Sequence, residues 1–208
     1  MPRVNKVEKA RKAPGSCAKC GKKIQAGAPY RWWKFRYGGK RLRCMECPSP
    51  RPSELTNSDK LSRCYEAGES ISDAIEAFRK DYEIENLRGA MEEAAGQIRE
   101  VAEEYRESAA NVESGMNGNR MPICDELEEK ADNLESKADE IESAAGDLEE
   151  FDEDQARDDA QAEIEGEEFG DDGAKKERID EAADEKKEEW AEEQVGKAEE
   201  FTDISPEG

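Results

Sequence analysis

Two short cysteine motifs decide the fold of the N-terminal region. Residues 17–21 read Cys-Ala-Lys-Cys-Gly, residues 44–48 read Cys-Met-Glu-Cys-Pro, and 23 residues separate the two pairs. Two cysteines three positions apart let one tight turn aim both sulfurs at a tetrahedral zinc ion, and two such turns complete its shell. The sequence therefore predicts one structural Zn²⁺ ion bound by Cys17, Cys20, Cys44 and Cys47.

The same spacing also occurs in redox-active motifs, but those need a surrounding strand–helix–strand unit that the short proline-rich surroundings do not supply. The chain has six cysteines and no histidine. We therefore expect Cys64 and Cys124 to be free thiols, and a reducing compartment follows from this cysteine usage. Four cysteine ligands leave zinc no open position for substrate, which favours a non-enzymatic protein.

The stretch between the motifs predicts a β-hairpin. Residues 30–37 are aromatic and basic, Gly38-Gly39 suits a two-residue turn, and residues 40–44 form the returning strand. A turn centred there pairs residues whose numbers add to 77, which places Trp33 and Cys44 on one face. The other face then carries a basic cluster beside an aromatic ring, made of Trp32, Lys34, Arg36, Arg41 and Arg43.

This basic cluster is the candidate nucleic-acid interface. Like charges opposed across strands are unfavourable without a counter-charge, and the phosphate backbone of DNA or RNA supplies one. Residues 1–52 carry 15 Lys or Arg and two Glu, a net charge of +13. We expect the cations to bind phosphates and Trp32 to stack on a base, assisted by a basic flexible leader over residues 1–14. A solvated basic face, or Trp32 packed under the linker, is the alternative.

The cysteine spacing, the glycine after Cys20 and the aromatic hairpin resemble zinc-ribbon domains, here over residues 15–48. A small zinc head joined to a charged helical body is also similar to uncharacterised bacteriophage proteins. This second resemblance covers mainly residues 15–65 and implies no known activity. It implies a location in the host cytoplasm for a phage-encoded chain.

A mainly helical body follows a proline-rich linker, which we expect to be extended and free of helix over residues 49–57. Within residues 58–151, a short helix should run from Ser58 to near Gly68, and a longer one should begin at Ile71. From there, two sets of apolar residues repeat every seven positions. The first set is Ile84, Met91, Ile98, Tyr105 and Val112; the second is Leu127, Leu134, Ile141 and Leu148.

These two sets predict a long antiparallel helical hairpin, similar to a coiled coil. Glycines and a proline between them, over residues 115–122, suit a chain reversal. Facing residues then have numbers that add to 239, as in Ile98 with Ile141. We expect the arms at about 71–114 and 122–151, a region through which the protein would self-associate or bind a protein partner.

The remaining residues, 152–208, predict an acidic and largely disordered tail, because they offer little apolar surface to offset the entropy of ordering. One further helix is expected within it, over residues 174–201. Residues 53–208 carry 17 basic and 52 acidic residues, a net charge of −35. Such a charge suits contact with a basic protein surface or imitation of nucleic acid.

Together these features favour a zinc-binding accessory protein whose head contacts DNA or RNA and whose body recruits a protein. The alternative is a protein–protein adaptor, or an acidic nucleic-acid mimic, without direct nucleic-acid binding. A small-molecule substrate is not expected. No apolar run is long enough to cross a membrane, so the sequence predicts no membrane contact and a cytoplasmic protein.

Overall fold

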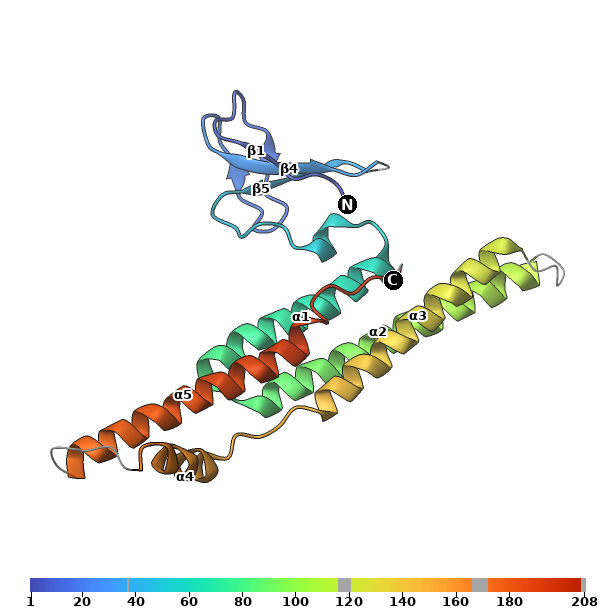
Figure 1. Ribbon diagram of the computed structural model, residues 1–208. Coiled ribbons are helices and arrows are strands. Elements are labelled where there is room, and N and C mark those ends of the chain that lie inside the picture. The colour runs from blue at the N-terminus through green and yellow to red at the C-terminus, as the bar shows by residue number, and fades with distance from the viewer. Residues whose placement is uncertain (37, 116–120, 166–171, 207–208) are drawn as a thin grey trace. The chain divides into compact units, whose positions relative to one another are not determined.

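A computed structural model describes residues 1–36, 38–115, 121–165 and 172–206 (Figure 1). The chain divides into two compact units, one comprising Met1–Glu66 with Ser205–Gly208 and the other Ala67–Ile204. The first unit holds the cysteine motifs, and the second is helical. Each unit is described by itself below.

The first unit is built from two small antiparallel sheets. Strands β1 (Asn5–Val7), β4 (Tyr30–Lys34) and β5 (Lys40–Cys44) form a three-stranded sheet in the order β1-β4-β5, and β2 (Gly15–Ser16) pairs with β3 (Lys23–Ile24). The predicted flexible leader is wrong, because its residues supply strand β1. Ala10 is also buried and donates its N–H to the Ala28 carbonyl at 3.1 Å.

The hairpin is present, but its predicted register is wrong. Trp32 pairs with Leu42 and Arg31 with Arg43, so facing residues have numbers that add to 74 rather than 77. The prediction assumed a sheet with one solvated face. Each face in fact buries one aromatic side chain, Tyr30 on one and Trp33 on the other. In the observed register residues 35–39 connect the two strands, and Tyr37 among them lies outside the described residues.

The linker contains a helical turn where an extended chain was expected. A 3-10 helix, η1, spans Pro52–Leu55, and its first position is Pro52. Proline at the start of a helix costs no hydrogen bond, because the first N–H groups have no partner within the helix. The predicted helix-free linker over 49–57 is therefore wrong in its central part.

Helix α1 runs without a break over Asp59–Asp81, through Gly68, where the sequence suggested an end. Gly68 is buried, and a Cβ atom there would lie 2.6 Å from the carbonyl oxygen of Thr202. Glycine is thus used for close backbone approach within the second unit and not to end the helix. The break comes instead at Tyr82, whose φ of 58° ends α1 before α2 begins.

Helices α2 (Ile84–Gly115) and α3 (Pro122–Gly146) form the expected antiparallel pair (Figure 1). The predicted bounds of its arms are wrong, because the first arm begins at Ile84 rather than Ile71, after the break at Tyr82, and the second ends at Gly146 rather than 151. The predicted seam residues Met91, Ile98, Leu134 and Ile141 are each fully buried. Arginines on α2 reach carboxylates on α3, as in the 2.8 Å contact between Arg99 Nη2 and Asp139 Oδ1. The turn over residues 116–120 lies outside the described residues, and supercoiling of the pair remains a prediction.

Two helices occupy the region predicted as a largely disordered tail, and that prediction is wrong for most of it. Helix α4 spans Glu153–Glu163 and α5 spans Asp172–Glu199, close to the helix expected over 174–201. The linker expected at 166–171 lies outside the described residues. A few large side chains anchor α5: the Trp190 ring contacts Phe78 at 5.5 Å and Phe151 at 5.3 Å between centroids.

Among the described residues, none of these helices combines the length and the apolar character that a membrane crossing needs.

Candidate metal centre

The four predicted ligands meet at one point. The Sγ atoms of Cys17, Cys20, Cys44 and Cys47 all lie within 4.8 Å of one another. Cys17 and Cys47 are 3.9 Å apart, and Cys20 and Cys44 are 3.7 Å apart. A tetrahedron with Zn–S bonds of about 2.3 Å has sulfur–sulfur edges of about 3.8 Å, whereas a disulfide bond measures about 2 Å. The donor set and its spacing therefore fit a metal ion, most simply zinc.

The first pair is held by a tight turn between β2 and β3. Cys17 donates its N–H to the Lys22 carbonyl at 2.9 Å, and Gly21 donates to the Cys17 carbonyl at 3.0 Å. Gly21 has a φ of 72°, a conformation that a side chain would strain. Ala18 donates to the Leu42 carbonyl at 2.7 Å, which joins this turn to β5. The glycine after the second cysteine is thus a requirement of the turn geometry.

The second pair closes the site from the end of β5. Cys44 is the last residue of that strand, and the chain turns so that Cys47 returns towards it. The Arg31 side chain donates to the Cys47 carbonyl at 3.1 Å and so fixes the turn. Two turns from distant parts of the sequence therefore supply two ligands each.

The sulfur atoms interact strongly before any metal binds. Burial tends to raise the pKa of Cys17, but the backbone N–H groups of Cys20, Cys44 and Lys19 together lower it from 9.0 to about 6. Hydrogen bonding to Cys44, followed by burial, raises the pKa of Cys47 from 9.0 to about 12. The Cys17 thiolate therefore forms readily, whereas a negative charge on Cys47 beside it is disfavoured. A divalent cation removes that conflict, because it stabilises all four as thiolates.

A buried ion pair lies beside the ligands. Arg43, 2% exposed, precedes Cys44 and donates through Nη1 to Glu54 Oε2 at 2.9 Å, while its Nη2 donates to the other carboxylate oxygen. Nη1 also lies 3.3 Å from the Pro48 carbonyl oxygen. The pair holds η1 and the start of the linker against the hairpin face that contains Trp33. Sequence reasoning missed Glu54 because the shifted register hid the burial of Arg43.

The predicted nucleic-acid residues do not share one face. Arg43 is buried and ion-paired. Arg41 is exposed on the same face, where its guanidinium lies 5.6 Å from the Phe35 ring centroid. Lys34 is exposed on the opposite face, which also carries Trp32. Arg36 is exposed beyond the end of β4.

Lys40 joins Lys34 and Trp32 on their face and was missed by sequence reasoning. It pairs directly with Lys34 across the strands, and its Nζ atom lies 4.3 Å from the centroid of the Trp32 ring. The expected register placed it opposite Tyr37 instead. The signal that could have found it is the alternation of Tyr30 and Trp32 on one strand with Leu42 and Cys44 on the other.

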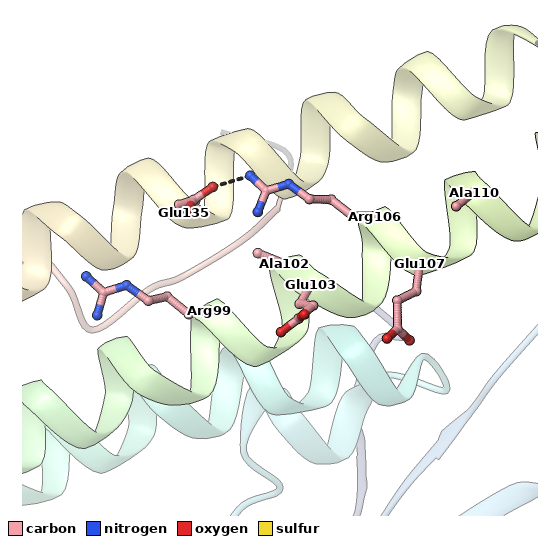
Figure 2. Close-up of a pocket in the computed structure, with 7 residues that line it drawn as sticks. All are labelled: Arg99, Ala102, Glu103, Arg106, Glu107, Ala110 and Glu135. Atoms are coloured by element: carbon pink, nitrogen blue, oxygen red, sulfur yellow. Dashed lines mark hydrogen bonds and ion pairs between the residues drawn. The ribbon is translucent and has the colours of Figure 1, made fainter.

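A separate groove of about 520 Å³ runs along α2, far in sequence from the four clustered cysteines. Figure 2 shows Arg106 reaching towards Glu135 on α3, with Glu103 and Glu107 directed away from that helix. Arg99 and Arg106 each contact two α3 carboxylates. The groove is therefore the flank of an ion-paired helix interface.

No protein-family model, curated protein or solved structure matches the chain. The likeness to a zinc ribbon thus rests on the four clustered cysteines and the strands that carry them, and the resemblance to bacteriophage proteins gains no support.

Proposed function

We propose that the protein is a non-enzymatic accessory protein whose zinc-stabilised N-terminal unit binds nucleic acid through phosphate contacts. The observation that carries this proposal is the set of exposed cations around the end of the β4–β5 hairpin. Lys34, Lys40 and Arg41 are exposed, and within the described residues none of them pairs with a carboxylate. Zinc binding fixes the strands that present them.

Charge supports the same proposal. Four thiolates and one divalent ion lower the +13 charge of residues 1–52 to about +11, which still attracts a polyanion. Long lysine and arginine side chains can contact phosphates from several directions. The cations on both faces and at the tip of this narrow hairpin can therefore bind the phosphate backbone of one nucleic-acid strand. Arg43 takes no part, because its guanidinium is occupied by Glu54.

The test is binding of DNA and RNA to the full-length, zinc-loaded chain across a salt series, measured by fluorescence anisotropy. A triple variant, Lys34→Glu, Arg36→Glu and Arg41→Glu, should bind more weakly, with the salt slope reduced by about 2 to 3. The matched control carries Lys80→Glu, Lys175→Glu and Lys176→Glu, which change the net charge equally outside the first unit. Equal binding by both triple variants would contradict the proposal.

A second candidate function concerns the helical body. Met121 and Ile123, two positions apart at the start of α3, are 39% and 41% exposed. They support recruitment of a protein partner, or self-association, through the α2–α3 pair. Sedimentation of the full chain with and without Met121→Ser and Ile123→Ser tests self-association. If the chain binds no nucleic acid at low salt, the adaptor or acidic-mimic function replaces the first proposal.

A further inference from the structure

We propose that Trp32, Lys34 and Lys40 form a site for one unpaired base and its flanking phosphates, so that the head selects single-stranded over duplex nucleic acid. This inference rests on the proposed function and specifies its ligand class.

The three side chains share one face of the β4–β5 hairpin. Trp32 pairs with Leu42 across the strands, and Lys34 pairs with Lys40, which places Lys40 diagonal to Trp32. The Lys40 ammonium lies 4.3 Å from the Trp32 ring centroid and 5.6 Å from that of Tyr30. Trp32 is only half-buried, since it also packs against the core formed by Ala10, Ile24 and Tyr30. An exposed lysine that reaches the indole shows that the ring can be approached from solvent.

The charges at this site call for an anion. Lys34 and Lys40 are directly opposed, a destabilising arrangement without a counter-charge, and in the described part of the chain neither forms an ion pair with a carboxylate. The contact of Lys40 with the indole replaces a counter-charge only in part, because exposed cation–π contacts are weak. A nucleotide provides a partner for the Trp32 ring and for Lys40 at once, because its base stacks on the ring while the Lys40 ammonium moves to a phosphate.

The preference for single-stranded nucleic acid follows from the geometry of base stacking. In a duplex, each base lies between its neighbours and offers no free face to a protein side chain, whereas an unpaired base can stack on an aromatic ring. Phosphates are available in both forms. The lysines alone would therefore bind the two forms alike, and the ring creates the preference.

Trp33 provides an internal comparison. It is adjacent in sequence but 1% exposed, on the opposite face, where Arg43 lies 5.6 Å from its ring centroid. A base cannot reach it while Arg43 and Glu54 remain paired. Any contact between a base and tryptophan in the first unit should therefore involve Trp32.

Photocrosslinking tests this in the unmodified full-length protein. Single-stranded oligomers containing 5-bromouracil, one of DNA and one of RNA, are irradiated with the zinc-loaded chain, and crosslinked peptides are mapped by mass spectrometry. A crosslink at Trp32 from either oligomer is expected, and the two arms show whether both nucleic acids enter the site. Crosslinks at other residues alone, from an oligomer that binds, would overturn the inference.

Substitution measures the preference itself. Trp32→Ala should weaken single-strand binding by about 5- to 150-fold, the range for loss of one stacked base, and change duplex binding by less than about twofold. Lys40→Gln removes only a phosphate contact and should weaken binding of single-stranded and duplex nucleic acid equally. Its control is Lys23→Gln, which removes one positive charge from β3. The zinc content of each variant shows whether it is folded. If Trp32→Ala has lost its zinc, the crosslinking of the unmodified protein is the deciding test. Equal affinity for both forms overturns this inference alone, whereas no binding of either overturns the proposed function as well.

Discussion

The guanidinium of Arg43 donates to both carboxylate oxygens of Glu54 and thereby ties strand β5, beside the ligand Cys44, to the 3-10 helix that follows the second motif. Glu54 also accepts the backbone N–H of Arg51 at 3.0 Å. A cation this deeply buried is tolerated because it is paired. The linker is consequently part of the folded first unit.

Replacing Glu54 by Gln should destabilise the first unit by about 1–3 kcal/mol. Loss of the carboxylate leaves Arg43 buried and unpaired, and the cost falls below the roughly 3–5 kcal/mol of a fully buried pair because Glu54 is partly exposed to water. Unfolding monitored by chemical denaturation checks this. Glu46→Gln is the control, since the Glu46–Lys22 pair is exposed on both sides. Equal free energies of unfolding in the two variants would show that the Arg43–Glu54 pair stabilises the first unit no more than the exposed pair does.

Removing zinc should unfold the first unit and leave the helical unit folded. The apolar cluster of the first unit is small, with Ala10, Ile24 and Tyr30 as its buried members, whereas the helices bury a larger and separate set of side chains. Metal analysis should give one zinc per chain. After chelation, amide NMR signals of residues 15–48 should collapse while the far-ultraviolet helical signal persists. Complete loss of that helical signal would show that the second unit depends on the metal.

Gly68→Ala should destabilise the second unit by about 1–3 kcal/mol, because the new methyl group meets the Thr202 carbonyl oxygen at 2.6 Å. Gly96→Ala is the matched control in α2, where a methyl group would meet nothing within 4 Å. That change should stabilise by about 0.5–1 kcal/mol, since alanine favours helix more than glycine. Thermal unfolding of both variants gives the comparison, and two stabilised variants would disprove the close approach.

Stability should fall between about pH 9 and pH 11 because of Cys64. Burial raises the pKa of this thiol from 9.0 to about 11. The unfolded chain therefore loses its proton first as the pH rises, which favours unfolding by about 1.4 kcal/mol per pKa unit until the folded thiol also ionises. Below pH 9 the stabilisation is fully present.

Cys64→Ala should remove that part of the pH dependence, which the parent chain keeps. Denaturant unfolding from pH 8 to pH 11 measures both slopes. Identical slopes in the parent chain and the variant would show that another group is responsible.

Sequence patterns predicted the parts of this fold that depend on spacing alone. The two cysteine pairs gave the metal ligands, and the seven-residue repeat gave the α2–α3 pair with Ile98 and Ile141 in its seam. In both cases one local geometry, a tight turn or a helical face, determines where a side chain points. Neither prediction requires knowledge of which residues pack against that turn or that helical face.

The errors share a different cause. The hairpin register, the role of Arg43 and the use of Gly68 all depend on what packs against a surface from elsewhere in the chain. An exposed basic face and a buried ion pair look alike in sequence until Glu54 is known to cover Arg43. The acidic tail was misjudged in the same way, because Trp190 of α5 packs against Phe78 and Phe151 from other parts of the chain.

The close passage of Thr202 over Gly68 means that the helical unit, Ala67–Ile204, begins and ends at nearly the same place. A unit whose two ends meet can be closed by a short peptide without a change in its packing. A short peptide bridging the two junctions, with new termini opened between α3 and α4, would give a circular permutant with the same helical packing. Helix α1 crosses the boundary at Glu66, so such a permutant would have to keep residues 59–66 with the body to preserve that helix.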